Sequence, residues 1–297
     1  MKHHKKISLV LGSGGARGYA HIGVIEELEK QGYEIVSISG SSMGALVGGL
    51  YACGKLGAYK EWVLGMDAMD IASLLDFSMS HGGLIEGDKV FREIHKMVGQ
   101  INIETLPIKF TAVATDIVKQ KEIWFQKGDL VDAIRASIAI PSVFTPVRRE
   151  GMILIDGGVL NPLPISPTLS DINDQTIAVN LNAQSDKKYS IDIPLNELKK
   201  ESSTAKIFFE MAHKAQALFF NDKVEKKEEM NILQIMGKTI DVMQNAVLKC
   251  KMAGYSPDIM IDIPHDTCDF YEFHKAYKLI EIGKMIVRDH FSIKQEK

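Results

Sequence analysis

The sequence predicts an α/β protein in which a mainly parallel central sheet lies between two layers of helices, a three-layer α/β/α arrangement. Apolar runs of strand length alternate with amphipathic runs of helical period through most of the chain. Glycine-rich turns follow the first two strand-like runs and lead directly into helices, which is typical of parallel strand–turn–helix units. At 297 residues, with 45% hydrophobic and 25% charged side chains, the chain can bury a sizeable core.

The first predicted strand, residues 6–11, is followed by a glycine-rich loop and by a helix that ends before Gly32. The loop reads Gly12, Ser13, Gly14, Gly15, Ala16, Arg17 and Gly18. A dinucleotide-binding loop would need an acidic residue at the end of the second strand, and a P-loop would end in Gly-Lys-Ser/Thr. Neither is present. We therefore favour an oxyanion hole, whose N–H donors can each contribute roughly 3 kcal/mol to a transition state.

The second strand, from Ile35, runs directly into a Gly-x-Ser-x-Gly turn and then into a helix of small residues over 45–53. This arrangement is typical of a nucleophile elbow, with Ser42 at the apex and with Gly40 and Gly44 leaving room for strand and helix to approach. A serine that merely caps the helix is the alternative, but the strand–helix context favours a nucleophile. Because parallel strands that follow one another are usually neighbours, Gly14 and Gly15 should lie beside Ser42.

Arg17 has two possible roles, which the sequence leaves open. It could pair with a carboxylate and hold the shape of the loop, or it could contact a substrate phosphate. Short helices are predicted at 56–65 and 69–75, and an amphipathic helix at 88–98. The apolar, methionine-containing stretch 66–87 would suit a mobile lid over a site for acyl chains, although an ordinary loop packed on the core fits equally well.

Asp156 is delivered by a short predicted strand, residues 153–155, into the turn Asp156-Gly157-Gly158. It follows paired strands at 109–117 and 122–125 and a helix at 130–137. An aspartate in such a turn has a carboxylate that is free to project. Alone, this pattern indicates only a turn, but beside a nucleophile elbow and an oxyanion loop it makes Asp156 a candidate base.

The rest of the chain adds a strand at 176–181, a polar lysine-rich stretch, two long helices at 204–220 and 228–252, and a final helix at 273–290. A strand at 257–263 returns the chain to the sheet. We therefore expect one domain over 1–297, with a core of about 6–182 plus this strand and a helical insertion at about 200–252. The apolar stripe of the second long helix could pack on its own sheet or on a second copy in a homo-oligomer.

Charge and composition restrict the partners and the compartment. A net charge of −3 gives no general attraction to nucleic acid, and three cysteines without metal spacing favour a reducing compartment. The apolar run 7–11 is too short for a signal peptide. We expect a cytoplasmic protein whose membrane contact, if any, is peripheral at the inner face. Asp116, Asp129 and Asp132 could form a calcium set, but solvated or structural roles fit better, so we expect no metal and no cofactor.

Taken together and in this order, the segments 12–18, 40–44 and 156–158 resemble those of the patatin-like phospholipase family, in its bacterial, cytoplasmic form. Similarity extends to YAHIGVIEELEKQG at 19–32, RASIAIPSVFTPV at 135–147 and KMAGYSPDIMIDIP at 251–264. The chain departs from the family at Ser13, where glycine is common, but a serine there keeps the N–H donors. The resemblance implies a patatin-like fold and a hydrolase that needs no cofactor.

The resemblance also implies a Ser42–Asp156 dyad. Ser42 attacks an ester carbonyl, Asp156 acts as its base, and Gly14, Gly15 and Ala16 donate N–H groups to the oxyanion. Gly12, Arg17, Gly18, Gly40, Gly44, Gly157 and Gly158 support these groups. The implied substrates are phospholipids, lysophospholipids or other fatty acyl esters.

Three alternatives stay open. A Ser-His-Asp triad is the mechanistic rival, since spacing alone cannot exclude any of the nine histidines. The same nucleophile could also serve an acyltransferase that passes the acyl group to an alcohol or thiol. A regulatory membrane-surface protein with little catalysis is the third reading, although the intact motifs argue against a degenerate enzyme.

Overall fold

A computed structural model describes residues 5–66, 70, 88–141, 143–184, 187–189, 191–194, 197 and 232–292. The helices expected at 69–75 and 204–220, and nearly all of the stretch 66–87 expected as a lid, lie outside these residues. The expectation of a single domain over 1–297 stays a prediction.

One mixed, mostly parallel sheet of eight strands organises the chain, in the order β5-β6-β3-β2-β1-β7-β8, with β4 paired to β3. The strands β1, β2, β3, β7 and β8 run parallel to one another, whereas β4 and β6 pair antiparallel with β3 and β5 pairs antiparallel with β6. The strands are β1 Lys5–Leu11, β2 Tyr33–Ser41, β3 Lys109–Asp116, β4 Lys121–Phe125, β5 Val147–Arg149, β6 Met152–Asp156, β7 Gln175–Ala183 and β8 Ile259–Pro264.

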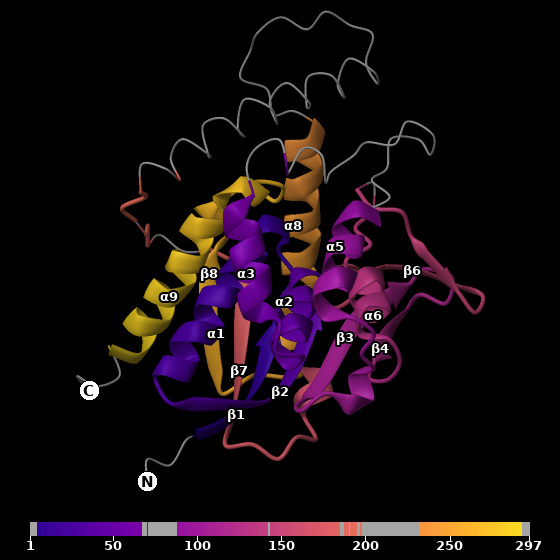
Figure 1. Ribbon diagram of the computed structural model, residues 1–297, viewed down its shortest axis with the longest axis horizontal. Helices are drawn as coiled ribbons and strands as arrows, with labels where there is room; N and C mark the ends of the chain where they lie inside the picture. The colour runs from indigo at the N-terminus through magenta and orange to yellow at the C-terminus, as the bar shows by residue number, and fades with distance from the viewer. Residues whose placement is uncertain are drawn as a thin grey trace, which may run out of the picture.

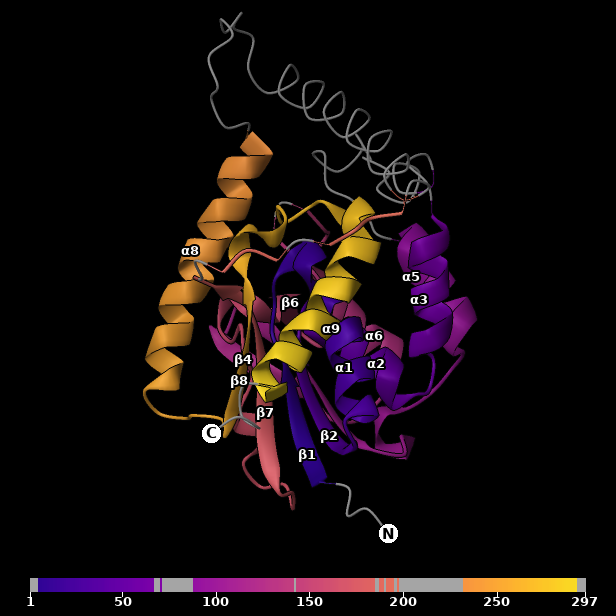
Figure 2. The same cartoon turned by 90° about the vertical axis from the view of Figure 1, so that its left-hand side faces the viewer.

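Helices cover both faces of this sheet (Figures 1 and 2). Figure 2 shows α8 on one side and α1, α2, α6 and α9 on the other. The helices are α1 Ala20–Lys30, α2 Met43–Ala52, α3 Leu56–Gly65, α5 Asp88–Val98, α6 Leu130–Ser137, α8 Ile232–Met252 and α9 Ala276–Ser292. Short 3-10 turns are η1 Gly15–Tyr19, η3 Ile103–Thr105, η4 Gly157–Val159, η5 Ser166–Thr168, η6 His265–Thr267 and η7 Phe273–Lys275. The predicted α/β fold class with helices on both faces is thereby confirmed.

The alternation of side chains along β1 divides the core between the two faces. Leu9 and Leu11 belong to the main core under α1, α2, α6 and α9, whereas Val10 faces the smaller cluster under α8. The strand is buried on both faces, which is why it reads as a continuous apolar run. α1 packs against α9 and ends before Gly32, whose φ is +88°.

The apolar side chains of α8 lie in two different surroundings within this chain. Near its C-terminal end, Leu248 and Met252 pack against the cluster that contains Val10. Farther toward its N-terminus, Met236, Ile240 and Met243 line a cavity beside Asp156. Part of the stripe is therefore covered within the chain, whereas Ile235 and Met243 remain 49% and 54% exposed.

Most predicted element bounds agree with the structure to within two residues, with two differences. The short strand β5 was not predicted, because three residues that include two arginines give no strand signal. The final helix was expected from Phe273, but the first three of these residues form the 3-10 turn η7. The start expected for the long helix, residues 228–231, lies outside the described residues, and α8 is described from Ile232.

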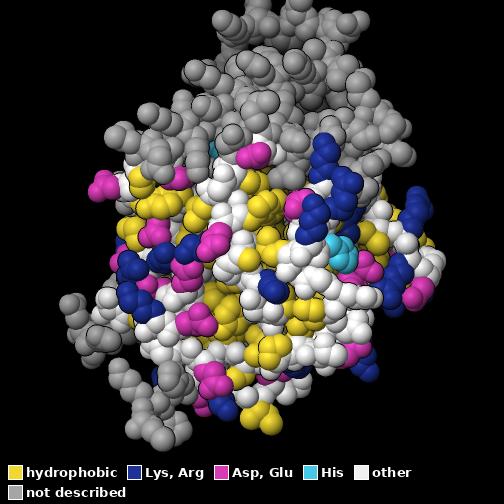
Figure 3. Space-filling view, in the orientation of Figure 1, with side chains coloured by type: hydrophobic (Ala, Val, Ile, Leu, Met, Phe, Trp, Pro, Cys, Tyr) yellow, Lys and Arg dark blue, Asp and Glu magenta, His cyan; other side chains and the backbone are white. Residues whose placement is uncertain are grey.

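Charges of both signs are interspersed on the face seen in Figure 3, and apolar side chains reach that surface at several places. Among the helices that the structure describes, none combines the length and the hydropathy that a bilayer-spanning segment requires.

Candidate functional site

Ser42 occupies the sharp turn between β2 and α2 in a backbone conformation that is rare for a residue with a side chain. Its φ is +55° and its ψ is −124°. A Cβ on Gly44 would collide with the carbonyl of Leu11 at the end of β1, and a Cβ on Gly40 would collide with Gly44. The two flanking glycines are therefore required by the close approach of strand and helix, as the elbow motif predicts.

Ser137 at the end of α6 holds this turn in place, a contact that the sequence reasoning missed. Its Oγ accepts a hydrogen bond from the Ser42 N–H at 2.9 Å and donates to the carbonyl of Val113 on β3 at 2.6 Å. Ser137 is fully buried. It lies in the segment 135–147 that resembled known relatives, which was the one signal that could have found it.

The pairing of three adjacent strands brings Asp156 to the elbow. Ser41 on β2 pairs with Val113 on β3, and the next β3 residue, Ala114, pairs with Asp156 on β6. Gly157 packs so closely that an added Cβ would lie 2.7 Å from Ser41 Oγ. The expected base and the expected nucleophile therefore meet at one edge of the sheet.

Burial controls the acidity of Asp156, which is 3% exposed. Desolvation raises the pKa of its carboxyl to about 7, although the Ser42 side chain and the Gly158 N–H both act to lower it. The Gly158 N–H donates to Oδ1 at 2.7 Å. Among the described residues, neither Ser42 Oγ nor Asp156 Oδ2 forms a hydrogen bond that meets ordinary distance and angle limits. The Ser42 side chain therefore contacts the Asp156 carboxyl only loosely.

The glycine-rich loop leaves the end of β1 beside the elbow, because Leu11 pairs with Gly40 in the parallel β1–β2 register. In the part of the chain that the structure describes, the Gly14 and Gly15 N–H groups donate to no acceptor. The Ala16 N–H differs, since it donates to the carbonyl of Phe270 at 2.8 Å. Of the three donors expected for an oxyanion, Ala16 is therefore already occupied in this conformation.

Arg17 adopts the first of the two roles considered for it. It is 1% exposed, and its guanidinium donates to both carboxylate oxygens of Asp241 on α8, at 2.5 and 3.2 Å. It also donates to Asn182 Oδ1 at 2.8 Å and to the His265 carbonyl at 2.9 Å. These contacts engage both terminal nitrogens of the guanidinium and join the glycine loop to α8, whereas the buried Nε has no partner among the described residues.

No histidine among the described residues hydrogen-bonds to Ser42. The nearest in sequence to the glycine loop, His21, is fully buried and its Nε2 lies 2.8 Å from the Gly12 carbonyl, to which it donates. Burial lowers the pKa of His21 to about 4, so this ring stays neutral near pH 7. His265 directs Nδ1 to the carbonyl of Ala183 at 3.1 Å. His81 and His213 lie outside the described residues.

Three cavities lie near these groups. The α8 cavity, of about 320 Å³, is mainly apolar and is lined by Asp156, Gly158, Ile140 and residues of α8. A smaller apolar cavity of about 80 Å³ lies between Met43 and the helices α3 and α5, and Ile140 lines both. A polar cavity of about 560 Å³ lies on the other flank of α8 and includes Arg17. The α8 cavity is the one that contains the expected base.

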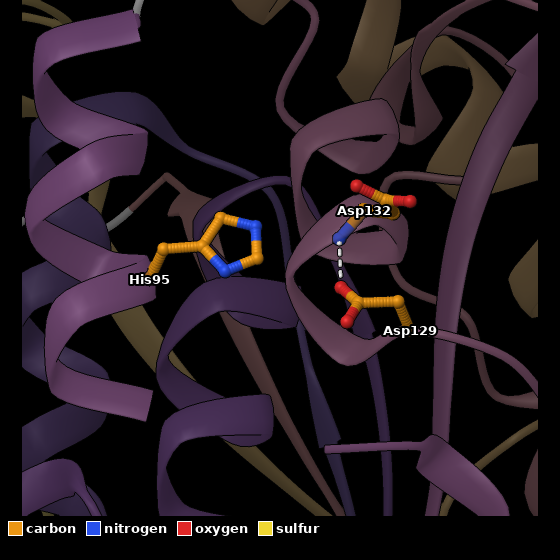
Figure 4. A group of neighbouring side chains, drawn as sticks. All are labelled: His95, Asp129 and Asp132. Atoms are coloured by element: carbon orange, nitrogen blue, oxygen red, sulfur yellow. Dashed lines mark hydrogen bonds between the residues drawn. The ribbon is translucent and has the colours of Figure 1, made fainter. Parts of the chain in front are cut away.

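Two of the aspartates once considered as calcium ligands gather elsewhere. His95, Asp129 and Asp132 place one ligand atom each within 4.8 Å of one another, between α5 and the start of α6 (Figure 4). Asp129 immediately precedes α6 and caps it, because its Oδ1 accepts the Asp132 N–H at 2.9 Å. Asp116 instead bonds the Val118 N–H at 3.0 Å. These contacts give Asp129 and Asp116 structural roles.

The sequence is similar to those of known proteins. The family model described as Patatin-like phospholipase matches residues 9–169. An NTE family protein of Mycobacterium tuberculosis is 37% identical over 325 aligned residues, covering 95% of this chain and 90% of that protein. Patatin-like phospholipase domain-containing protein 6 of Mus musculus is 31% identical over 191 residues, 62% of this chain and 14% of that protein. Among solved structures, VipD from Legionella pneumophila aligns with a TM-score of 0.44 at 15% identity, over 97% of this chain and 67% of VipD. The chain belongs to the patatin-like phospholipase family.

Proposed function

We propose that the protein is a serine esterase of the lipid acyl hydrolase class, of phospholipase A or lysophospholipase type, which acts through a Ser42–Asp156 dyad. The observation that carries the proposal is the buried carboxyl of Asp156, with its pKa raised to about 7, next to a serine on a strained elbow. A base whose pKa lies near the working pH combines a useful ionised fraction with a high proton affinity. An ordinary aspartate would be too weak a base.

In the first half-reaction, Asp156 takes the Ser42 hydroxyl proton as Oγ bonds to the ester carbonyl carbon. The carbonyl π electrons move to oxygen, and the Gly14 and Gly15 N–H groups stabilise the resulting oxyanion. Collapse of this intermediate breaks the bond to the alcohol, which leaves with the proton from Asp156. In the second half-reaction Asp156 activates a water molecule, which releases the fatty acid and restores Ser42.

The α8 cavity supports a fatty acyl chain as the group that is bound. Its walls are aliphatic side chains, and an apolar cavity of about 150 Å³ already binds benzene, so about 320 Å³ admits a longer chain. Ile235 and Met243 on its rim are 49% and 54% exposed. This exposed rim supports peripheral contact with a lipid surface from which the chain enters.

The test is hydrolysis of phospholipids, lysophospholipids and short p-nitrophenyl esters by the wild-type protein, Ser42→Ala and Asp156→Asn. We expect both variants to lose hydrolysis while they stay folded, and a fluorophosphonate probe to label the wild type but not Ser42→Ala. Each of the nine histidines is replaced in turn as a control. One histidine variant as inactive as Ser42→Ala would contradict the dyad and favour a triad. A product analysis with added alcohol separates hydrolysis from acyl transfer.

A further inference from the structure

A continuous chain of hydrogen bonds joins α8 to the glycine loop inside the protein. Gln244 Nε2 on α8 donates to Ser13 Oγ at 3.0 Å, and Asn182 Nδ2 on β7 donates to Gln244 Oε1 at 3.0 Å. Arg17 Nη2 completes the chain by donating to Asn182 Oδ1 at 2.8 Å. All four side chains are 4% exposed or less. A buried hydrogen-bond network of this kind restrains the elements that it joins.

The donor-only chemistry of arginine fixes the direction of this chain. Because the Arg17 guanidinium has no acceptor, Asn182 must turn its oxygen toward Arg17 and its NH₂ group toward Gln244. Gln244 must then present its oxygen to Asn182 and its NH₂ group to Ser13. The pairing of Arg17 with Asp241, one helical turn before Gln244, anchors the other end of the network to the same helix.

Gln244 also contacts the turn that carries the expected base. An added Cβ on Gly158 would collide with Gln244 Nε2 and would lie 2.6 Å from Ser13 Oγ and 2.9 Å from Asp156 Oδ1. The amide of Gln244, the hydroxyl of Ser13 and the Asp156 turn therefore meet at one point. Gln244 lines the α8 cavity as well.

We propose that Gln244 is a positioning residue that fixes the oxyanion loop relative to the Asp156 turn, acting through Ser13. This inference rests on the proposed function. The loop and the turn come from different strands, and Gln244 is a side chain that touches both. Loss of its amide removes the side-chain tether of Ser13 and leaves the backbone bond from the Ser13 N–H to the Pro162 carbonyl, so the Gly14 and Gly15 donors lose their alignment with the oxyanion. A displacement of about 1 Å in such a group can cost about 100-fold in rate.

The test uses the full chain, Gln244→Met, and a soluble p-nitrophenyl butyrate substrate. We expect kcat to fall about 10- to 100-fold, with KM within about twofold of wild type, because the amide acts on the transition state. Asn245→Met is the matched control, since Asn245 is the next residue of α8, is half-buried and lines the polar cavity. This control should keep the wild-type kcat.

A double-mutant cycle with Ser13→Ala separates positioning from general stability. If Gln244 acts through Ser13, the double variant loses no more kcat than Gln244→Met alone, whereas independent effects multiply.

A Gln244→Met protein with a lowered Tm but a kcat within threefold of wild type would overturn the inference, and so would multiplicative effects. If Gln244→Met does not fold, Ser13→Ala alone decides, with lower kcat supporting the inference and wild-type kcat refuting it. A wild-type protein that neither hydrolyses the ester nor reacts with a fluorophosphonate would instead refute the proposed function, and this inference with it.

Discussion

Asp241 on α8 forms a two-point ion pair with Arg17 of the glycine loop, 224 residues earlier in the sequence. The Arg17 side chain is 1% exposed and that of Asp241 is 14% exposed. Because α8 also lines the cavity beside Asp156, this pair connects the wall of that cavity to the loop that supplies the oxyanion donors. The helix and the loop are therefore expected to lose stability together.

Asp241→Ala should lower the free energy of unfolding by about 3 kcal/mol, because it leaves the buried guanidinium of Arg17 without its carboxylate. Urea denaturation followed by circular dichroism measures the change. The control is Asp289→Ala, which breaks an exposed ion pair with Lys187. In that pair the Lys187 side chain is 54% exposed and the Asp289 side chain is 43% exposed. The loss in this control should be much smaller, because solvent screens an exposed ion pair. Equal losses in the two variants would show that Arg17 does not depend on Asp241.

The raised pKa of Asp156 predicts that activity and stability change in opposite directions with pH. Activity needs the ionised carboxylate, so kcat/KM should rise with pH through about 7. Stability follows the other direction. The unfolded carboxyl ionises near its ordinary pKa of about 3.9 while the folded one keeps its proton, so folding is progressively penalised between about pH 4 and pH 7.

Asp156→Asn removes that penalty. The variant should match the wild-type free energy of unfolding most closely near pH 4 and should gain on it as the pH rises to 8, by a few kcal/mol at most. Chemical denaturation at pH 4, 6 and 8 measures the difference. A constant difference between the two proteins at all three pH values would mean that the pKa of Asp156 is not raised in the folded protein.

The α8 cavity predicts a dependence on acyl chain length. Ile240→Trp replaces a branched aliphatic side chain with a larger aromatic one in this cavity. The kcat/KM for a dodecanoyl ester should therefore fall at least about 10-fold, while that for a butanoyl ester stays within about threefold. The control is Val242→Trp, on the same helix but 69% exposed and outside the α8 cavity, which should leave both values unchanged. Equal losses for the two esters in Ile240→Trp would place the acyl chain elsewhere.

Asp129 is expected to act as a helix cap rather than as a metal ligand. Asp129→Ala should lower the free energy of unfolding by about 1 kcal/mol, because the Asp132 N–H loses its acceptor. Asp129→Asn retains a capping oxygen and should keep most of the stability. Addition of a chelator should change neither the Tm nor the ester hydrolysis of the wild type. A Tm that falls with the chelator would indicate instead that His95, Asp129 and Asp132 hold a cation.

Local chemistry made much of this site predictable. Gly40 is required by contacts within a few residues of the chain, because a Cβ there would collide with Gly44, whereas Gly44 is required by the neighbouring strand at Leu11. The parallel pairing of β1 and β2 also follows from the sequence, because consecutive strands joined by one helix are usually neighbours. These rules were enough to bring the glycine loop to the elbow.

The sequence by itself determined the elbow, the glycine loop and the Asp-Gly-Gly turn, because the residue types and spacing that identify each lie within a short segment. Only the tertiary structure decided how they are arranged. The antiparallel register of β6 on β3 sets Asp156 beside the elbow. Two residues far away in sequence hydrogen-bond to the other segments, Ser137 to the elbow and Gln244 to the glycine loop. Such side chains carry no local signature, since a serine ending a helix or a glutamine within one fits many surroundings. Their role arises from burial and from the polar partners that the fold places next to them.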